Sequence, residues 1–344
     1  RRSAGRRGKG PVTPRAPSAW LLAALLGFAA CRPAAGKTPA AIDMGPVCGA
    51  VTPTSAVVVV RATEPHTRVR LLVGTDPSLQ NRVPSTMRES DKETGLIVKT
   101  QLEGLSADTV YHYVVEVNDR TNATPRGQFR TFPPPQAASF TFAFGNSLYA
   151  DTPRSALYAA AKHDPLFFLN TGDLFYRDIA ADDLDVFRGA YREAFASAAQ
   201  SELYRRVPLA YIWDDHDFGP NNADASAPGR KASRRAYTEI VPHYPLPLQA
   251  QGPICQAFTV GRVRFILTDL RSERQFNSRP DGPGKTMLGK EQLEWFKQEL
   301  LASSRSSALV FWVSSVTWIE SPMEGGDHWG SYAHERRQLA NFIR

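Results

Sequence analysis

The alternation of hydrophobic and polar residues predicts a region of β-strands over residues 42–132. Apolar and β-branched residues recur there with a period of two, as expected of strands with one buried face. Candidate strands span residues 55–61, 68–73, 96–102 and 110–117, and clusters of turn-forming residues separate them. Short strands without any helical period over about 90 residues favour a β-sandwich.

From residue 138 to residue 344 the pattern changes, and short apolar runs alternate with the hydrophobic spacing of helices. A run of prolines at residues 133–135 marks the boundary as a stiff linker. Strands are predicted over residues 140–144, 166–169, 209–213, 262–268 and 308–314, and helices over residues 155–163, 182–206, 289–303 and 334–344. This alternation predicts a layered α/β domain whose polar functional residues lie at the ends of its strands.

Residues 1–37 have the pattern of a leader: a basic stretch, apolar residues at positions 19–30, and then Cys31. An apolar helix of this length would span about 18 Å, which is shorter than the membrane's hydrocarbon core of roughly 30 Å. The segment therefore predicts a secretory signal peptide and a secreted, periplasmic or cell-surface protein. Cys31 is a candidate site for a lipid anchor. No later segment is apolar and long enough to be predicted as transmembrane.

The basic pI of about 9.4 comes from this leader. Eight of the 41 Lys and Arg residues precede Asp43, the first acidic residue, which leaves 33 basic residues against 34 acidic ones. A nearly neutral body lacks the basic surface that binding to nucleic acid requires, so no nucleic-acid partner is expected.

The chain has three cysteines, Cys31, Cys48 and Cys255. If Cys31 is removed with the leader or lipidated, Cys48 and Cys255 could form a disulfide or remain as two separate buried thiols. The sequence leaves both alternatives open, because it does not place the two sulfur atoms within bonding distance.

Potential metal ligands follow several of the predicted strands. They fall in residues 145–147, 171–176, 214–217, 221–222 and 268–271. Carboxylate, imidazole, amide and phenolate groups from different strands can surround hard cations. The strongest signal is His216 among three aspartates in residues 214–217, because carboxylates packed together repel one another unless a cation holds them. Asp269 alone could equally be the N-cap of a helix.

These blocks resemble the alkaline phosphatase D family of the metallophosphoesterases. Residues 172–176 are similar to its Gly-Asp-x-x-Tyr block, and residues 213–222 to its Trp-Asp-Asp-His-Glu…Asn-Asn block. Residues 269–271, and residues 326–332 with the Glu-Arg pair that follows, are similar to later segments of the family. The resemblance covers residues 42–344. It implies an N-terminal β-sandwich followed by a layered α/β metallophosphoesterase domain, and a phosphate ester as substrate.

The resemblance also implies a site for iron with calcium, although other divalent metals could serve. By that comparison Asp173 is a central and bridging ligand, and Tyr176 binds iron through its phenolate. Asp215, together with Asn221 or Asn222, completes the shell of the other metal. A dinuclear site of this kind would polarise a phosphoryl oxygen and deliver a metal-bound hydroxide.

Two further residues have catalytic roles by the same resemblance. His216 would contact the phosphoryl oxygen or act as an acid. Arg271 would bind the phosphate of the substrate, whose geometry a guanidinium matches. A structural salt bridge is the alternative for Arg271, and a hydrogen-bonded structural role is the alternative for His216 when it is considered alone.

The sequence departs from the family pattern in two places. Ser147 stands where the family has a cysteine ligand for iron, and a hydroxyl is a poorer iron ligand than a thiolate. The closing Gly-Asp-x-His block of the family is absent, so we expect a C-terminally incomplete domain that could be inactive alone. A phospholipase D-like diesterase, with Phe218 and Trp329 as an apolar rim, and a catalytically inactive secreted binding protein are the alternatives to a phosphatase.

Overall fold

The computed structural model describes residues 41–121, 125–148 and 154–344. The predicted leader and its Cys31 lie outside these residues. Within the described part, no helix has the length and apolar character needed to cross a membrane.

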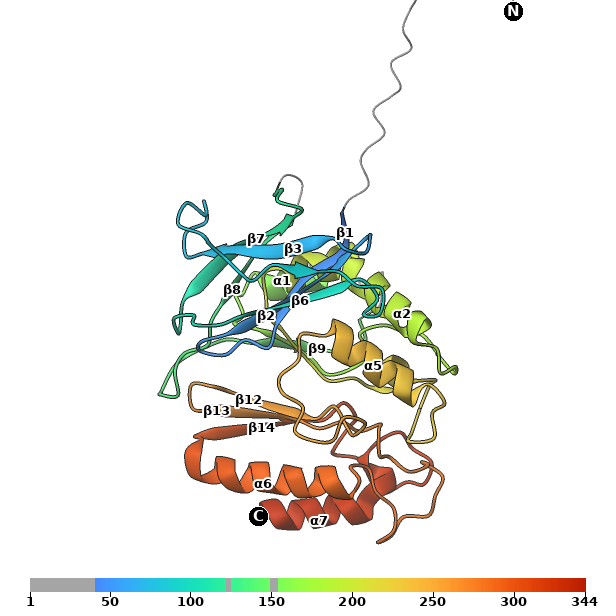
Figure 1. The fold of residues 1–344 in the computed structure, drawn as a ribbon. Helices are drawn as coiled ribbons and strands as arrows, with labels where there is room; N and C mark the ends of the chain where they lie inside the picture. The colour runs from blue at the N-terminus through green and yellow to red at the C-terminus, as the bar shows by residue number, and fades with distance from the viewer. Residues whose placement is uncertain (1–40, 122–124, 149–153) are drawn as a thin grey trace, which may run out of the picture. The chain divides into compact units, whose positions relative to one another are not determined.

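The first part of the described chain is built from β-strands that form two facing layers (Figure 1). One layer has the order β6-β2-β1, and the other the order β4-β3-β7-β8 with β5 also paired to β3. Valine and leucine side chains from both layers fill the space between them. The strands are β1 (Ile42–Gly49), β2 (Ala56–Ala62), β3 (Arg68–Gly74), β4 (Val83–Pro84), β5 (Arg88–Glu89), β6 (Ile97–Leu102), β7 (Val110–Val117) and β8 (Arg126–Arg130).

The second part alternates strands and helices, as its hydrophobic pattern predicts. Its first strands and helices are β9 (Ala143–Gly145), α1 (Arg154–Ala161), β10 (Phe168–Asn170), α2 (Leu184–Ala196), α3 (Ala198–Tyr204), β11 (Leu209–Tyr211), α4 (Asp215–Phe218) and α5 (Arg230–Ile240). They are followed by β12 (Gln256–Val260), β13 (Val263–Leu267), α6 (Lys290–Ser306), β14 (Leu309–Val313), the 3-10 helix η1 (Trp329–Tyr332) and α7 (Ala333–Ile343). The predicted α/β fold class is therefore confirmed.

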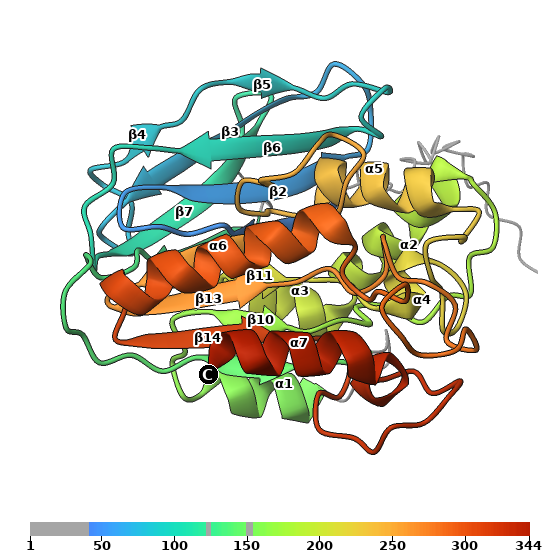
Figure 2. The same cartoon turned by 90° about the horizontal axis from the view of Figure 1, so that it is seen from below.

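Two small sheets face each other in this second part. The strands β9, β10 and β11 are parallel, while β13 pairs antiparallel with β12 and parallel with β14. Helices α6 and α7 lie over the outer face of the second sheet (Figures 1 and 2). Phenylalanine rings fill the space between the sheets. The ring centroids of Phe142 and Phe167 are 5.2 Å apart, as are those of Phe167 and Phe265, and each such pair adds roughly 0.5–1.5 kcal/mol to the energy of burial.

A single sheet continues from the first part of the chain into the second. Gly49 of β1 pairs in parallel with Leu209 of β11, so the strand order is β6-β2-β1-β11-β10-β9. The described residues accordingly form one compact unit. The shared sheet places the ends of β10 and β11, where the candidate ligands begin, on a rigid support.

The structure corrects one prediction from the sequence and decides between two alternatives for the cysteines. The helix predicted over residues 182–206 is two helices, because Ser197 between α2 and α3 has an extended backbone with a ψ of 141°. Cys48 and Cys255 are both buried and unbonded, so the structure has the two separate thiols rather than the disulfide.

Candidate metal centre

Three aspartate carboxylates meet at the carboxyl ends of β10 and β11. Asp173 follows β10, and Asp214 and Asp215 follow β11. One oxygen from each carboxylate lies within 4.8 Å of the others. All three side chains are buried, with relative exposures of 8%, 9% and 5%. Because buried like charges repel at this distance, the cluster has the character of a cation site.

The backbone at the end of β10 is strained, and this strain brings Asp173 to the cluster. Asp173 has a φ of 53° and Gly172 a φ of 121°. A Cβ atom on Gly172 would lie 2.4 Å from the Cβ atom of Asp214, so only glycine permits the two loops to approach so closely. Unfavourable backbone of this kind is retained where the surroundings enforce it, commonly at functional sites.

Asp217 supplies part of that enforcement. Its carboxylate is completely buried, and its Oδ1 accepts hydrogen bonds from the backbone N–H groups of Leu174 at 2.7 Å and Phe175 at 3.2 Å. Its Oδ2 accepts from the N–H of Asp214 at 3.1 Å. Asp217 thus ties the loop after β10 to the loop after β11, and its role is to hold the two loops together rather than to bind a ligand.

Ser147 and Tyr176 lie beside Asp173. The Tyr176 hydroxyl donates to Asp173 Oδ2 at 2.8 Å, and the Ser147 hydroxyl lies 3.4 Å from the same oxygen. In contrast, Asp173 Oδ1 is buried and has no hydrogen-bond partner among the described residues. A buried carboxylate oxygen without a partner is costly, and a bound cation would satisfy it.

The electrostatic environment of Asp173 also indicates a cation site. Burial, and then the negative charge of Asp214, raise the pKa of Asp173 to about 6, although the hydrogen bond from Tyr176 opposes the shift. Burial also raises the pKa of Asp214, while the charge of Arg271 opposes it. A cation at the cluster would favour the ionised carboxylates and reverse the shift of Asp173.

His216 lies at the edge of the cluster. Its ring centroid is 4.2 Å from that of Tyr176, and its side chain is 14% exposed. The Nδ1 atom is 3.2 Å from Asp178 Oδ1, but the two are not aligned as a hydrogen bond. The histidine is therefore placed where one face of its ring contacts the predicted ligands and a carboxylate lies next to one of its nitrogens.

The two predicted asparagine ligands approach the site through their backbones. The N–H of Asn222 donates to Asp215 Oδ2 at 2.6 Å, and the N–H of Asn221 donates to Asp178 Oδ1 at 2.8 Å. Both side chains are exposed. The structure thus brings this loop to Asp215, with the N–H of Asn222 and not its amide side chain in contact.

Arg271 forms structural salt bridges, which was the alternative to a role in binding phosphate. Its side chain is completely buried, and all three of its nitrogens are within hydrogen-bonding distance of Asp214, Asp327 or the carbonyl oxygen of Ala223. With its donors used in this way, Arg271 is correctly described as a buried ion-pair partner, and the catalytic role expected for it is not supported by this geometry.

Asp269 is also structural. It accepts hydrogen bonds from Trp213 Nε1 at 2.8 Å and from the Ser272 hydroxyl at 2.6 Å. Asp214, in contrast, belongs to the acidic cluster. Residues 214–217 were predicted to supply ligands, but among their aspartates the family resemblance singled out only Asp215. The position of Asp214 next to Asp215 in the acidic block was the available signal.

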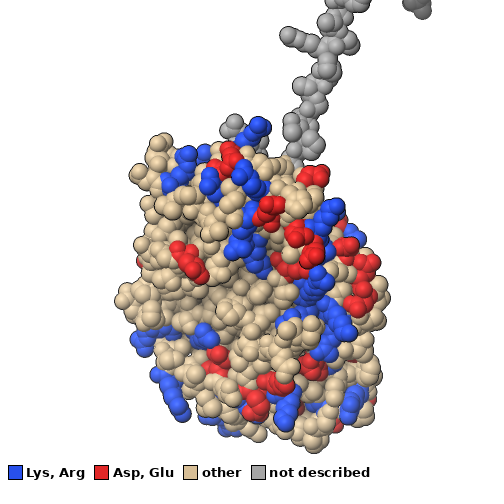
Figure 3. Space-filling view, in the orientation of Figure 1, with Lys and Arg blue, Asp and Glu red and all other residues tan. Residues whose placement is uncertain are grey.

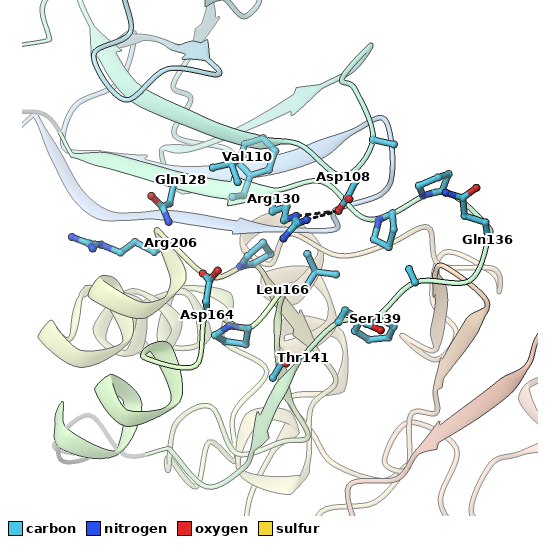
Figure 4. Close-up of a pocket in the computed structure, with 18 of the residues that line it drawn as sticks. Asp108, Val110, Gln128, Arg130, Gln136, Ser139, Thr141, Asp164, Leu166 and Arg206 are labelled. Atoms are coloured by element: carbon cyan, nitrogen blue, oxygen red, sulfur yellow. Dashed lines mark hydrogen bonds and ion pairs between the residues drawn. The ribbon is translucent and has the colours of Figure 1, made fainter.

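A cavity of about 540 Å³ lies elsewhere in the molecule (Figure 4). It is lined by residues including Gln128, Asp164, and the ion pair of Arg130 with Asp108, which are 2.9 Å apart. No residue of the acidic cluster lines it. This cavity and the acidic cluster are therefore two separate places in the molecule.

Facing sheets flanked by helices, with carboxylates gathered at the strand ends, are the arrangement that the resemblance to the metallophosphoesterases implies. The chain belongs to the PhoD-like phosphatase family: residues 135–344 match the PhoD-like phosphatase domain, and residues 29–133 match the N-terminal domain of PhoD-like phosphatases. The resemblance inferred from the motifs is thus confirmed.

The chain is also similar to individual proteins, in sequence to one and in fold to two others. The chain is 26% identical over 303 residues to alkaline phosphatase D of Bacillus subtilis (strain 168), covering 72% of this chain and 50% of that protein. It therefore spans about half the length of that curated relative. A solved structure of PhoD has a TM-score of 0.79 at 21% identity, covering 90% of this chain and 70% of that one. A purple acid phosphatase from yellow lupin seeds has a TM-score of 0.55 at 14% identity, with 80% and 51% covered.

Proposed function

We propose that this protein hydrolyses phosphate esters at a cation site formed by Asp173, Asp214 and Asp215. The observation that carries the proposal is the buried Asp173 Oδ1, which lacks a hydrogen-bond partner among the described residues and belongs to a cluster of carboxylates within 4.8 Å of one another. Membership of the PhoD-like phosphatase family gives the class of reaction.

The side chains at the site suit a hard cation. The carboxylates, the phenol of Tyr176 and the hydroxyl of Ser147 all offer oxygen, the donor that calcium, magnesium and ferric iron prefer. Iron with calcium is the pair that the family resemblance implies, and we propose it here with other divalent metals as the alternative. Ser147 in place of a cysteine shifts the donor set toward oxygen and so toward harder cations.

Bound cations of this kind polarise a phosphoryl oxygen and supply a nucleophile at neutral pH. The residues of the chain then have separate tasks. Asp173 and Asp215 orient the site from two strand ends, and Tyr176 holds one oxygen of Asp173. His216, whose Nδ1 lies next to Asp178, is assigned to hold a proton for the substrate on its other ring nitrogen.

The two alternatives from the sequence are less well supported. Phe218 and Trp329, suggested as an apolar rim for a phospholipase D-like enzyme, are both completely buried, so neither can contact a lipid. The assembled acidic cluster argues against a catalytically inactive binding protein. We retain a secreted, periplasmic or cell-surface location as part of the proposal, because it rests on the pattern of residues 1–37. Basic and acidic side chains are mixed on the face shown in Figure 3, in keeping with the proposed lack of a nucleic-acid partner.

The test is hydrolysis of p-nitrophenyl phosphate and bis-p-nitrophenyl phosphate by the purified protein, before and after chelation. We expect turnover to disappear with the metal and to return when Ca²⁺ with iron, or Mn²⁺, is restored. Turnover that persists after exhaustive chelation would refute a metal-dependent site. A protein that binds metal but hydrolyses neither substrate would support the inactive alternative.

A further inference from the structure

A chain of ion pairs through two buried arginines connects the acidic cluster to the loop before η1. Asp327 lies between two arginines that are both completely buried. Its Oδ2 is 2.8 Å from Arg271 Nη2 and its Oδ1 is 3.0 Å from Arg271 Nη1, which makes this contact bidentate. Its Oδ1 is also 2.5 Å from Arg274 Nη2. One carboxylate therefore serves two buried cations, and these charges hold the pKa of Asp327 down at about 2 although burial opposes them.

The opposite edge of the Arg271 guanidinium contacts one of the two carboxylate oxygens of Asp214 in the acidic cluster. Nε and Nη2 both lie on Oδ1 of Asp214, at 2.7 and 2.6 Å, and the hydroxyl of Ser315 donates to the same oxygen at 2.7 Å. In the capping box at the start of α4, the Asp214 side chain also faces the backbone N–H of Asp217. The arginine thus fixes Asp214 by Oδ1, and Oδ2 takes no part in this ion pair.

We infer that Asp327 is a positioning residue for the metal centre, acting through Arg271 on Asp214. This inference rests on the function proposed above. Without Asp327, the buried guanidinium would keep Asp214 and Asp215 as its nearest carboxylates, since Nη2 is already 3.9 Å from Asp215 Oδ1. A buried arginine that loses one anionic partner turns to the remaining ones, so Arg271 would compete with the cation for the carboxylates of the cluster.

Loss of the Asp327 charge would also weaken cation binding electrostatically. Asp327 neutralises one of the two buried arginines, which preserves negative charge for the cation at Asp173, Asp214 and Asp215. Groups that orient metal ligands from outside the coordination shell typically affect metal affinity by about 10- to 100-fold. We therefore expect Asp327→Asn to weaken binding of Mn²⁺ by at least about tenfold, and Asp327→Glu to restore part of the loss.

The experiment is calorimetric titration of the metal-free protein with Mn²⁺, with thermal unfolding of each variant alongside. Glu299→Gln is the matched control, because Glu299 accepts from Arg264 at 2.7 Å and is 24% exposed, close to the 26% of Asp327. Glu299→Gln loses the pair with Arg264, and Asp327→Asn loses its pairs with Arg271 and Arg274. Both variants should unfold at a lower temperature, but only Asp327→Asn should lose affinity for Mn²⁺. Equal affinity of Asp327→Asn and the wild type would overturn the inference.

Two further results distinguish a failure of the positioning role from a failure of the proposed function. If Asp327→Asn does not fold, Asp327→Glu and Ser315→Ala replace it, and wild-type affinity in both would overturn the inference. Asp173→Asn should abolish binding of Mn²⁺ whatever Asp327 does. A wild-type protein that binds no Mn²⁺ would refute the cation site itself, and the positioning role with it.

Discussion

Replacing Gly172 with alanine tests whether the close approach of the two loops assembles the metal centre. Gly172 has a φ of 121°, a conformation that residues with a Cβ atom rarely adopt. The added Cβ atom would also lie 2.4 Å from the Cβ atom of Asp214 and 3.0 Å from its backbone nitrogen. Neither atom is at the end of a flexible side chain, so the loop after β11 must move to relieve the contact.

The expected cost follows from these two effects. A residue held in such a sparsely populated backbone region costs roughly 1–3 kcal/mol, and displacement of the packed Asp214 adds to it. A loss of roughly 3 kcal/mol would lower the melting temperature by about 5–10 °C for a unit of this size. Since the displaced residue is a proposed ligand, affinity for Mn²⁺ should fall as well, by more than tenfold.

The assay is thermal unfolding together with Mn²⁺ titration of the purified variant. Gly104→Ala is the control, because Gly104 has a φ of 69° and a Cβ atom there would meet nothing within 4 Å. It should lose about 1 kcal/mol through backbone preference alone and retain its affinity for the metal. If Gly172→Ala behaved like Gly104→Ala in both measurements, the argument from close approach would be wrong.

Three more results are expected. Asp173→Asn should abolish both Mn²⁺ binding and turnover, whereas Asp183→Ala, which removes a cap that accepts from the N–H groups of Asp185 and Val186, should cost about 1 kcal/mol and remain active. Because the pKa of Asp173 rises from 3.8 to about 6 on folding, the metal-free protein holds this proton more tightly than the unfolded chain does. Its unfolding free energy in urea should therefore fall between about pH 4 and pH 6, with a shallower slope in Asp173→Asn. Asp217→Asn should lower that free energy by roughly 1–3 kcal/mol, because an amide nitrogen would face backbone donors.

Strands and helices with a clear hydrophobic period could be predicted from the sequence. Strands β2, β3, β6 and β7 and helix α6 lie within a few residues of the predicted ranges. Strand β1 was not predicted, because its Gly45 and Pro46 are typical of a turn. It forms because β2 and β11 pair with its two edges, and this long-range pairing overrides the local preference.

Helix α5 was not predicted for a different reason. Four of its eleven residues are arginine or lysine, and these charged residues interrupt the apolar spacing that a sequence pattern depends on. Ala232, Ala236, Tyr237 and Ile240 nevertheless form one buried face of the helix. Much of the stability of such a helix comes from packing of that face and not from local preference.

The candidate ligands show the same division between local and long-range information. Asp173, Tyr176 and Ser147 were selected from the sequence, and the structure brings them together. The choice between neighbours in the acidic block was beyond the sequence. Asp214 belongs to the acidic cluster, whereas Asp217 accepts hydrogen bonds from both loops and holds them together. These two roles follow from where each aspartate lies at the start of α4.

Arg271 shows most plainly why burial must be known before a role is assigned. A guanidinium close to aspartates in a phosphatase motif has the chemistry to bind phosphate, and nothing in the local sequence distinguishes that role from an ion pair. The distinguishing fact is its pairing with Asp214 and Asp327 in the interior. A buried arginine requires such partners, and it contacts Asp214 through one oxygen only. The same interaction that stabilises the arginine therefore fixes the position of a carboxylate in the acidic cluster, which links the packing of the core to the chemistry proposed for the site.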